Sequence, residues 1–122
     1  MRFSGDFGAA VVYDVRNLFE DGWCGPDVEF TVGANAEMTV LEFSAWTKAD
    51  VRSQSSRLTI AINNLPSFDF EIPNGRVVQI QAACPLQAGD AAKVRIRSDH
   101  VLGNIGEDTR ELSYIMKDLR FS

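Results

Sequence analysis

Short apolar runs rich in Val, Ile, Phe and Thr recur along the whole chain, and clusters of Gly, Pro, Asn and Asp separate them. Such runs are typical of strands and such clusters of turns, whereas no segment has a strong helical period. The pattern predicts eight strands, at residues 9–15, 28–32, 38–46, 57–63, 68–72, 76–83, 92–98 and 113–121. We therefore expect an all-β fold, an antiparallel β-sandwich or a barrel, in a single domain that spans residues 1–122.

The alternation of apolar and polar residues predicts which side chains face the core, because successive side chains of a strand point to opposite sides. In the strand at 38–46, Leu41, Phe43 and Ala45 share one side and direct Trp46 to the other. An outward tryptophan is unfavourable for a soluble protein, so Trp46 is a candidate functional residue.

The strands at 76–83 and 92–98 follow one another along the chain, and their apolar sets match if the two strands pair. That pairing places Gln79 beside Arg97 on the outer side of the sheet. It predicts one polar outer surface, formed by Gln79, Gln81, Arg95 and Arg97.

In the last strand, the parity of the apolar residues changes between Met116 and Leu119. An extra residue resets the alternation of a strand, so we predict a one-residue β-bulge near residues 117–118. The bulge would direct five side chains to the core: Leu112, Tyr114, Met116, Leu119 and Phe121. Burial of the strand on both faces over part of its length is the alternative.

The chain carries twelve Lys and Arg against seventeen Asp and Glu, which gives a net charge of −5 and a pI near 4.7. A nucleic-acid binder or a binder of anionic membranes would carry a basic field, so the charge argues against both classes. No apolar run approaches the roughly 20 residues that span a bilayer, and the N-terminus has no apolar region of the secretory type. We expect a cytoplasmic protein without a nucleic-acid partner and without membrane insertion.

Two cysteines, Cys24 and Cys84, lie 60 residues apart with no CxxC motif or Cys/His cluster near either. In a chain without a secretory signal, two reduced and partly buried thiols are expected, and a disulfide is the alternative. One histidine and two cysteines are too few for a zinc site, so no metal and no other cofactor is expected. Four residues could supply oxygen ligands to calcium, although their spacing matches no EF-hand loop: Asp99, Asn104, Glu107 and Asp108.

Two segments together resemble a known module: EDGWCGPD at residues 20–27 and DTRELSYIMKDLRF at residues 108–121. They resemble a small β-sandwich module that is fused to many bacterial glycosyltransferases and to other proteins of capsule, lipopolysaccharide and exopolysaccharide assembly. In that module a GW-x-GP turn enters an early strand, and a D-x-R-x-L-x-F-x-L-x-x-I-x-L segment forms the last strand. Here Cys24 occupies a variable position of the turn, and Ser113 stands where glycine is common.

The resemblance implies a jelly-roll-like sandwich, similar in outline to carbohydrate-binding modules, and it does not imply catalysis. The transferase chemistry of such proteins belongs to a separate nucleotide-sugar-binding domain. This chain has none of its signatures, because it lacks a GxGxxG motif, a P-loop lysine and a DxD triplet. We therefore interpret the chain as an accessory module with a glycan or polysaccharide as ligand and a glycosyltransferase catalytic domain as a possible partner.

Sugar recognition uses an aromatic face that stacks on pyranose C–H groups and polar side chains that bond the hydroxyls. The carbohydrate-binding residues predicted on this basis are Trp46, Trp23, Gln79, Gln81, Arg95 and Arg97. Trp23 has an alternative role as a plug at one end of the sandwich. The alternative role of the polar surface is that of a solvated sheet face whose side chains form cross-strand hydrogen bonds.

Two other classes of function remain open from the sequence. A structural or docking module would show an exposed apolar patch, and Trp46, Phe68 and Phe70 are its candidates. An enzyme would need convergent carboxylates or a histidine-based triad, and the only histidine, His100, follows a strand into a loop. Asp108 and Arg110 are expected to order the loop before the last strand. The prediction is a non-catalytic carbohydrate-binding module.

Overall fold

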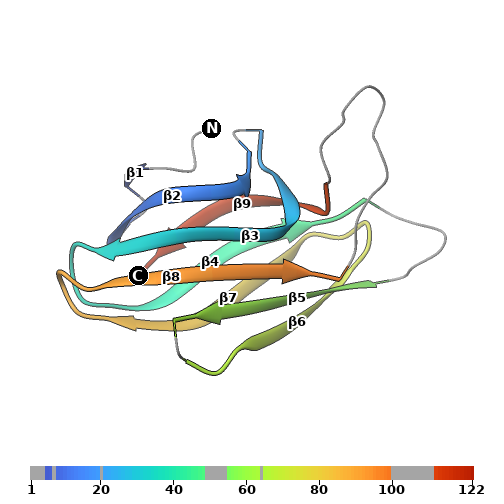
Figure 1. Cartoon of the computed structure of the whole chain (residues 1–122). Helices are drawn as coiled ribbons and strands as arrows, with labels where there is room; N and C mark the ends of the chain where they lie inside the picture. Colours follow the sequence, from blue (N-terminus) through green and yellow to red (C-terminus); the bar gives the residue numbers. More distant parts are fainter. Residues whose placement is uncertain (1–4, 7, 20, 49–54, 64, 100–111) are drawn as a thin grey trace.

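The computed structural model describes residues 5–6, 8–19, 21–48, 55–63, 65–99 and 112–122 (Figure 1). These residues form nine strands and no helix: β1 (Gly5–Asp6), β2 (Ala10–Leu18), β3 (Trp23–Ala34), β4 (Met38–Trp46), β5 (Ser55–Ile62), β6 (Phe68–Pro73), β7 (Val78–Leu86), β8 (Ala91–Ser98) and β9 (Tyr114–Phe121). Each of the eight predicted strands overlaps one of β2 to β9, so the all-β prediction is confirmed.

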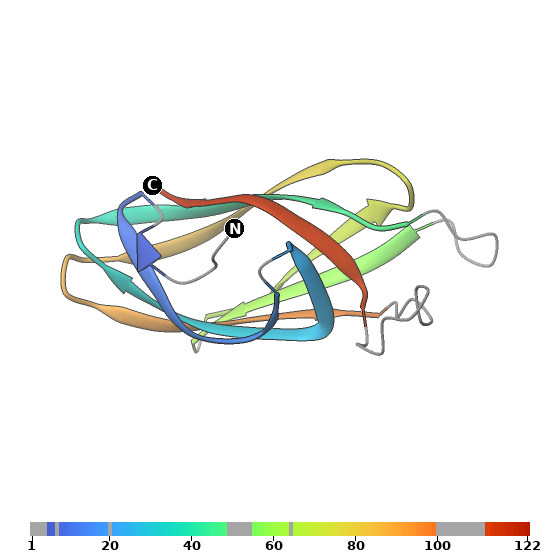
Figure 2. The same ribbon diagram turned by 90° about the horizontal axis from the view of Figure 1, so that it is seen from above.

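The strands lie in two layers that face one another (Figures 1 and 2). The large sheet has the order β6-β5-β8-β3-β2, with the two-residue β1 paired to β2. The small sheet has the order β7-β4-β9. All pairs of named strands are antiparallel. The predicted antiparallel, jelly-roll-like sandwich is confirmed.

β3 and β9 join the two layers at one end, where Trp23 pairs with Ile115. At the other end of β9, the Ala9 N–H donates to the Phe121 carbonyl oxygen over 3.0 Å. These contacts nearly close the sheet around the core. Through the pairing of β3 with β9, the strands follow one continuous order, β6-β5-β8-β3-β9-β4-β7, which has β6 and β7 at its two ends.

The inward side chains of both layers form one hydrophobic core, as strand parity predicts. From the large sheet, Leu58, Ile60 and Ile96 are fully buried, and from the small sheet Phe43 and Ile80 meet them. Side chains with opposite parity on these strands are more exposed. The core therefore leaves two outer faces, one on each sheet.

Both cysteines lie in the core as free thiols, Cys24 on β3 and Cys84 on β7. Desolvation by burial raises the pKa of each thiol, so both are protonated at neutral pH. The interpretation as two free thiols is confirmed, although both are fully buried rather than partly buried.

The predicted pairing of the strands at 76–83 and 92–98 is wrong. β7 pairs with β4, whereas β8 pairs with β3 and β5. The residues between them, 87–90, carry the chain from the small sheet to the large sheet. Ile80 and Ile96 therefore enter the core from opposite layers. Matching apolar parity gives the face of a strand, but not its partner.

The predicted bulge in the last strand is confirmed. Between Glu42 and Ser44, β4 advances by two residues, while β9 advances by three, from Arg120 to Lys117. Asp118 and Leu119 therefore stand opposite the single residue Phe43, which is the arrangement of a one-residue bulge. Asp118 has a φ of 57°. All five apolar side chains of this segment are buried: Leu112, Tyr114, Met116, Leu119 and Phe121.

β3 begins five residues earlier than predicted, at Trp23. The turn before it contains Gly22, whose φ of 93° suits glycine. Gly25 and Pro26 belong to the strand instead of to the turn. Pro26 can lie there because the register of β2 and β3 shifts between the Leu18–Cys24 pair and the next one, leaving this stretch out of the regular ladder.

Candidate functional site

Four side chains form a row across the outer face of the small sheet. Ile115 of β9 pairs with Trp23 of β3 on one side and with Trp46 of β4 on the other. Val77 precedes Val78, the partner of Ala45, and so extends the row beyond Trp46. We call Trp23, Ile115, Trp46 and Val77 the aromatic row.

The aromatic row is an exposed apolar surface with defined side-chain positions. The rings of Trp23 and Trp46 meet edge to face, with centroids 6.3 Å apart and planes inclined by 63°. Both tryptophans are half-buried, whereas the Val77 side chain is 68% exposed, more than Tyr13 or Leu65. Trp46 faces outward, as predicted. Trp23 is neither a buried plug nor a free ring, because it is half-buried and its ring contacts that of Trp46.

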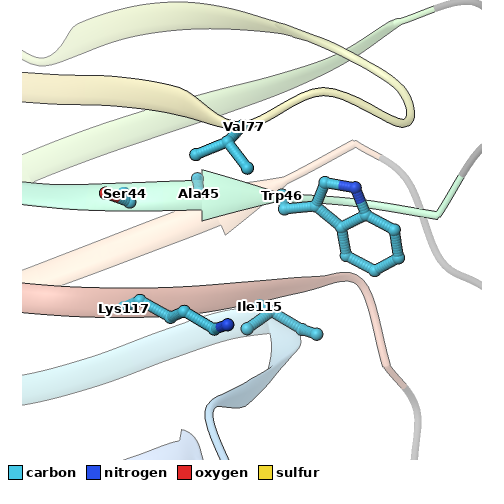
Figure 3. A pocket seen from close by; sticks show the side chains of 6 residues that line it. All are labelled: Ser44, Ala45, Trp46, Val77, Ile115 and Lys117. Atoms are coloured by element: carbon cyan, nitrogen blue, oxygen red, sulfur yellow. The ribbon is translucent and has the colours of Figure 1, made fainter.

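A first hollow of about 350 Å³ opens beside the aromatic row, lined by Ser44, Ala45, Trp46, Val77, Ile115 and Lys117. Figure 3 shows the Trp46 indole at the end of β4, with Val77 on one side and Ile115 on the other. The Lys117 side chain extends along β9, and its amine points toward Ile115. The hollow thus combines an apolar floor with a cation at its rim.

Polar side chains continue the same face along the strands. Gln79 Nε2 donates to the Ser44 hydroxyl over 2.7 Å. One step further, the Glu42 carboxylate accepts from Gln81 Nε2 (3.1 Å) and from Arg120 Nε (2.7 Å). These bonds hold amide, carboxylate and guanidinium groups on the outer surface.

A second hollow of about 430 Å³ lies within this polar part, lined by Glu42, Gln79, Asp118, Leu119 and Arg120. The hydrogen bonds from Arg120 and Gln81 lower the pKa of Glu42, and the charge of Arg120 acts in the same direction. Glu42 is therefore ionised at neutral pH. An ionised carboxylate can accept hydrogen bonds from hydroxyl groups.

Arg95 and Arg97 lie elsewhere, on the outer face of the large sheet. The Arg95 guanidinium binds Asp27 with two hydrogen bonds, of 2.9 and 2.7 Å. Arg97 pairs in register with Asp27 and with Thr59. The single polar surface predicted from Gln79, Gln81, Arg95 and Arg97 is wrong, because β7 and β8 belong to different layers.

The predicted docking patch does not assemble either. Phe68 and Phe70 alternate with exposed Asp69 and pack against the core from β6. Trp46 lies on the outer face of the other sheet. These phenylalanines help to cover the core and do not extend the apolar surface of Trp46.

Several residues considered for the loop before β9 lie outside the described residues: His100, Asn104, Glu107, Asp108 and Arg110. Asp99 is described, and its carboxylate accepts from the Arg57 N–H over 2.8 Å. Within the described ranges, no group of three or more His, Cys, Asp or Glu side chains is arranged to hold a metal ion. In the same ranges, no helix is long and apolar enough to cross a membrane.

The structure adds residues that the sequence did not single out: Val77, Ile115, Lys117, Ser44, Glu42, Asp118 and Arg120. An apolar residue at an outward position was the available signal for Val77. For the β9 residues, the signal was the predicted bulge, which turns both Lys117 and Asp118 outward. Their meeting with Trp46 depends on the pairing of β4 with β9, which no local pattern gave.

Comparison with solved structures places the fold beside that of carbohydrate-binding modules. A family 35 carbohydrate binding module from an environmental isolate superposes with a TM-score of 0.50 at 11% identity, over 98% of this chain and 77% of its own. An exo-β-1,3-galactanase from Phanerochaete chrysosporium with β-1,3-galactotriose gives a TM-score of 0.48 at 12% identity. That match covers 90% of this chain and only 26% of the galactanase. At these identities the likeness is one of fold.

No protein-family model matches the sequence, and no curated protein matches it either.

Proposed function

We propose that this chain is a non-catalytic carbohydrate-binding module that holds a glycan against the outer face of the small sheet. The observation that carries the proposal is the aromatic row beside the first hollow. A pyranose ring presents a flat face of C–H groups, to which an indole face is complementary. The hydroxyl groups of the glycan need donors and acceptors, which Lys117, Gln79 and Glu42 supply along the same face.

The fold supports this proposal, because a family 35 carbohydrate binding module shares it. Fold alone does not give function, so the argument depends on the side chains of the face. Trp46, Trp23, Gln79 and Gln81, all predicted from the sequence, lie on that face. Arg95 is engaged by Asp27 on the other sheet and has no place in the proposed site.

The biological setting that we propose is cytoplasmic assembly of bacterial cell-surface polysaccharide, next to a glycosyltransferase catalytic domain. The resemblance of the segments at 20–27 and 108–121 to glycosyltransferase-associated modules supports it. A module that retains the growing glycan raises its effective concentration at the catalytic domain, because a second encounter becomes intramolecular.

Native affinity electrophoresis tests the binding proposal, with xanthan, alginate, hyaluronan, dextran and levan cast separately into the gel. We expect at least one polysaccharide to retard the protein, and Trp46→Ala to weaken that retardation about tenfold or more. Tyr13→Ala is the matched control, because Tyr13 is an exposed aromatic residue of β2. Unchanged mobility in all five gels would refute the proposal.

A docking function is the second candidate, and the exposure of Val77 beside Trp46 favours it. In that case the aromatic row would pack on another protein or on a second copy of this chain. Analytical ultracentrifugation distinguishes the two candidates. Glycan binding predicts a monomer at concentrations where polysaccharide retards the protein, whereas docking between copies predicts self-association that Trp46→Ala abolishes.

A further inference from the structure

We infer that the small-sheet face has two subsites and that it binds an oligosaccharide chain, which extends along β4, rather than a single sugar. This inference rests on the proposed function and specifies the length and position of its ligand. The first subsite is the first hollow beside Trp46, and the second subsite is the polar hollow at Glu42.

The spacing of the two hollows sets the length of the ligand. Trp46 and Glu42 are four residues apart on one strand, which corresponds to roughly 13 Å at the rise of a β-strand. That length exceeds the width of a single pyranose ring, so a ligand that fills both hollows has more than one sugar.

A hydrogen bond connects the two hollows. Ser44 lines the first and Gln79 lines the second, and the Gln79 amide donates to the Ser44 hydroxyl over 2.7 Å. Ser44 is buried, whereas Gln79 is exposed. The Gln79 side chain therefore stands where the two subsites meet, and its amide oxygen is an acceptor that a sugar hydroxyl can use.

The chemistry of the two subsites differs in a way that suits successive parts of a chain. The first offers the apolar surfaces of Trp46, Val77 and Ile115, which suit the C–H face of a ring. The second offers the carboxylates of Glu42 and Asp118 and the guanidinium of Arg120, which suit hydroxyl groups. Binding at the second subsite adds affinity only if the ligand reaches it.

The bulge in β9 provides the second subsite with its polar side chains. In regular alternation, four consecutive residues turn two side chains outward. Residues 117–120 turn three outward, because the bulge exposes Asp118 in addition to Lys117 and Arg120. The same bulge returns Leu119 to the core, so the burial of Leu119 stabilises the bulge in the absence of a ligand.

The experiment measures how ligand length affects competition in the affinity gel. Fragments of one, two, four and six sugar units are prepared by partial acid hydrolysis of a polysaccharide that retards the protein. We expect the hexasaccharide to restore mobility at a concentration, counted in sugar units, at least about tenfold lower than that of the monosaccharide. Equal potency per sugar unit would overturn the two-subsite inference and leave the proposed function intact.

Two variants locate the second subsite. Asp118→Gly removes a carboxylate and keeps the left-handed backbone, which glycine adopts without strain. Gln79→Ala removes the amide between the hollows, and Lys93→Gln on the large sheet is the control. We expect both variants to reduce the hexasaccharide advantage about threefold or more. Asp118→Gly should leave competition by the monosaccharide unaffected, and the control should leave competition by both ligands unaffected.

The remaining outcomes are also decisive. A hexasaccharide advantage that survives both variants, or an equal loss for monosaccharide and hexasaccharide, would overturn the second subsite. Circular dichroism of each variant excludes misfolding as the cause of a loss. No retardation by any of the five polysaccharides would overturn this inference together with the proposed function.

Discussion

The two outer faces of this sandwich are both formed by antiparallel strands, and they differ in chemistry. On the large sheet, opposite charges pair across neighbouring strands, as in the bidentate contact of Arg95 with Asp27 and the 2.8 Å contact of Lys93 with Glu29. On the small sheet, the aromatic row presents apolar side chains to water. The polar groups of the small sheet also bond one another, as Arg120 does with Glu42, so the aromatic row is what sets this face apart. It is the reason that we propose the small sheet as the binding face.

The comparison also separates stability from function. Charges on an exposed sheet contribute little to folding and keep the surface soluble. Val77, which is exposed beside the half-buried Trp46, serves neither purpose. Its place at the end of a row in which Trp23, Ile115 and Trp46 pair in register distinguishes the two faces.

The largest effect is expected from deletion of Asp118, which would remove the bulge and exchange the two faces of the end of β9. Leu119 and Phe121 would turn to the outer face. Their lost burial corresponds to about 3 to 6 kcal/mol, a large part of the stability of an ordinary domain. Urea denaturation followed by tryptophan fluorescence should show a much lower midpoint.

Asp118→Gly is the control for this deletion, because it keeps the bulge. Its free energy of unfolding should stay within about 1 kcal/mol of the wild-type value. An unchanged midpoint in the deletion variant would show that the bulge does not set the parity of β9.

A medium effect on stability is expected when one aromatic residue of each outer face is replaced by alanine. Trp46→Ala should lower the free energy of unfolding by about 1 to 3 kcal/mol, because it removes a half-buried ring and its contact with Trp23. Tyr13→Ala, on the large sheet, should change it by less than about 0.5 kcal/mol. Equal losses in urea denaturation would contradict the claim that Trp46 is held in place by its neighbours.

The smallest effect concerns acid. The hydrogen bond from Arg95 lowers the pKa of Asp27, and the one from Lys93 lowers the pKa of Glu29. A native pKa below the unfolded value stabilises the fold at pH values above the unfolded one, 3.8 for Asp27 and 4.5 for Glu29. This stabilisation is lost as the pH falls through the native values.

The variant D27N/E29Q should therefore lose less thermal stability than wild type between pH 6 and pH 3, as measured by the change in Tm. The difference should shrink in 0.5 M salt, because both pairs are exposed enough for screening. A wild-type Tm that falls no faster with acid than that of the variant would contradict the assignment.

The sequence was sufficient for the strands and their inward faces, because alternation is a local property of the chain. Even the bulge at residues 117–118 followed from a change of parity between Met116 and Leu119. The start of β3 could not be predicted in this way. Gly25 and Pro26 are typical of a turn, and their place in a strand depends on how that strand pairs with its neighbour.

The candidate site could be predicted only in part, for a physical reason. Trp46 and Gln79 were assigned to outward positions by parity, and both lie on the small-sheet face. Arg97 was added by assuming that consecutive strands pair, whereas residues 87–90 cross to the other layer. Strand partners depend on contacts between distant parts of the chain, and a single sequence does not contain them.

The strand order has one more consequence, for association between molecules. β6 is an edge strand of the large sheet and β7 is an edge strand of the small sheet, and an edge strand with free N–H and C=O groups is a template for aggregation. β6 is six residues long, carries exposed Asp69 and Glu71, and ends at Pro73. β7 contains Pro85, which has no N–H to offer an added strand. Like charge and proline thus protect these two edges against pairing with the same edge of another molecule.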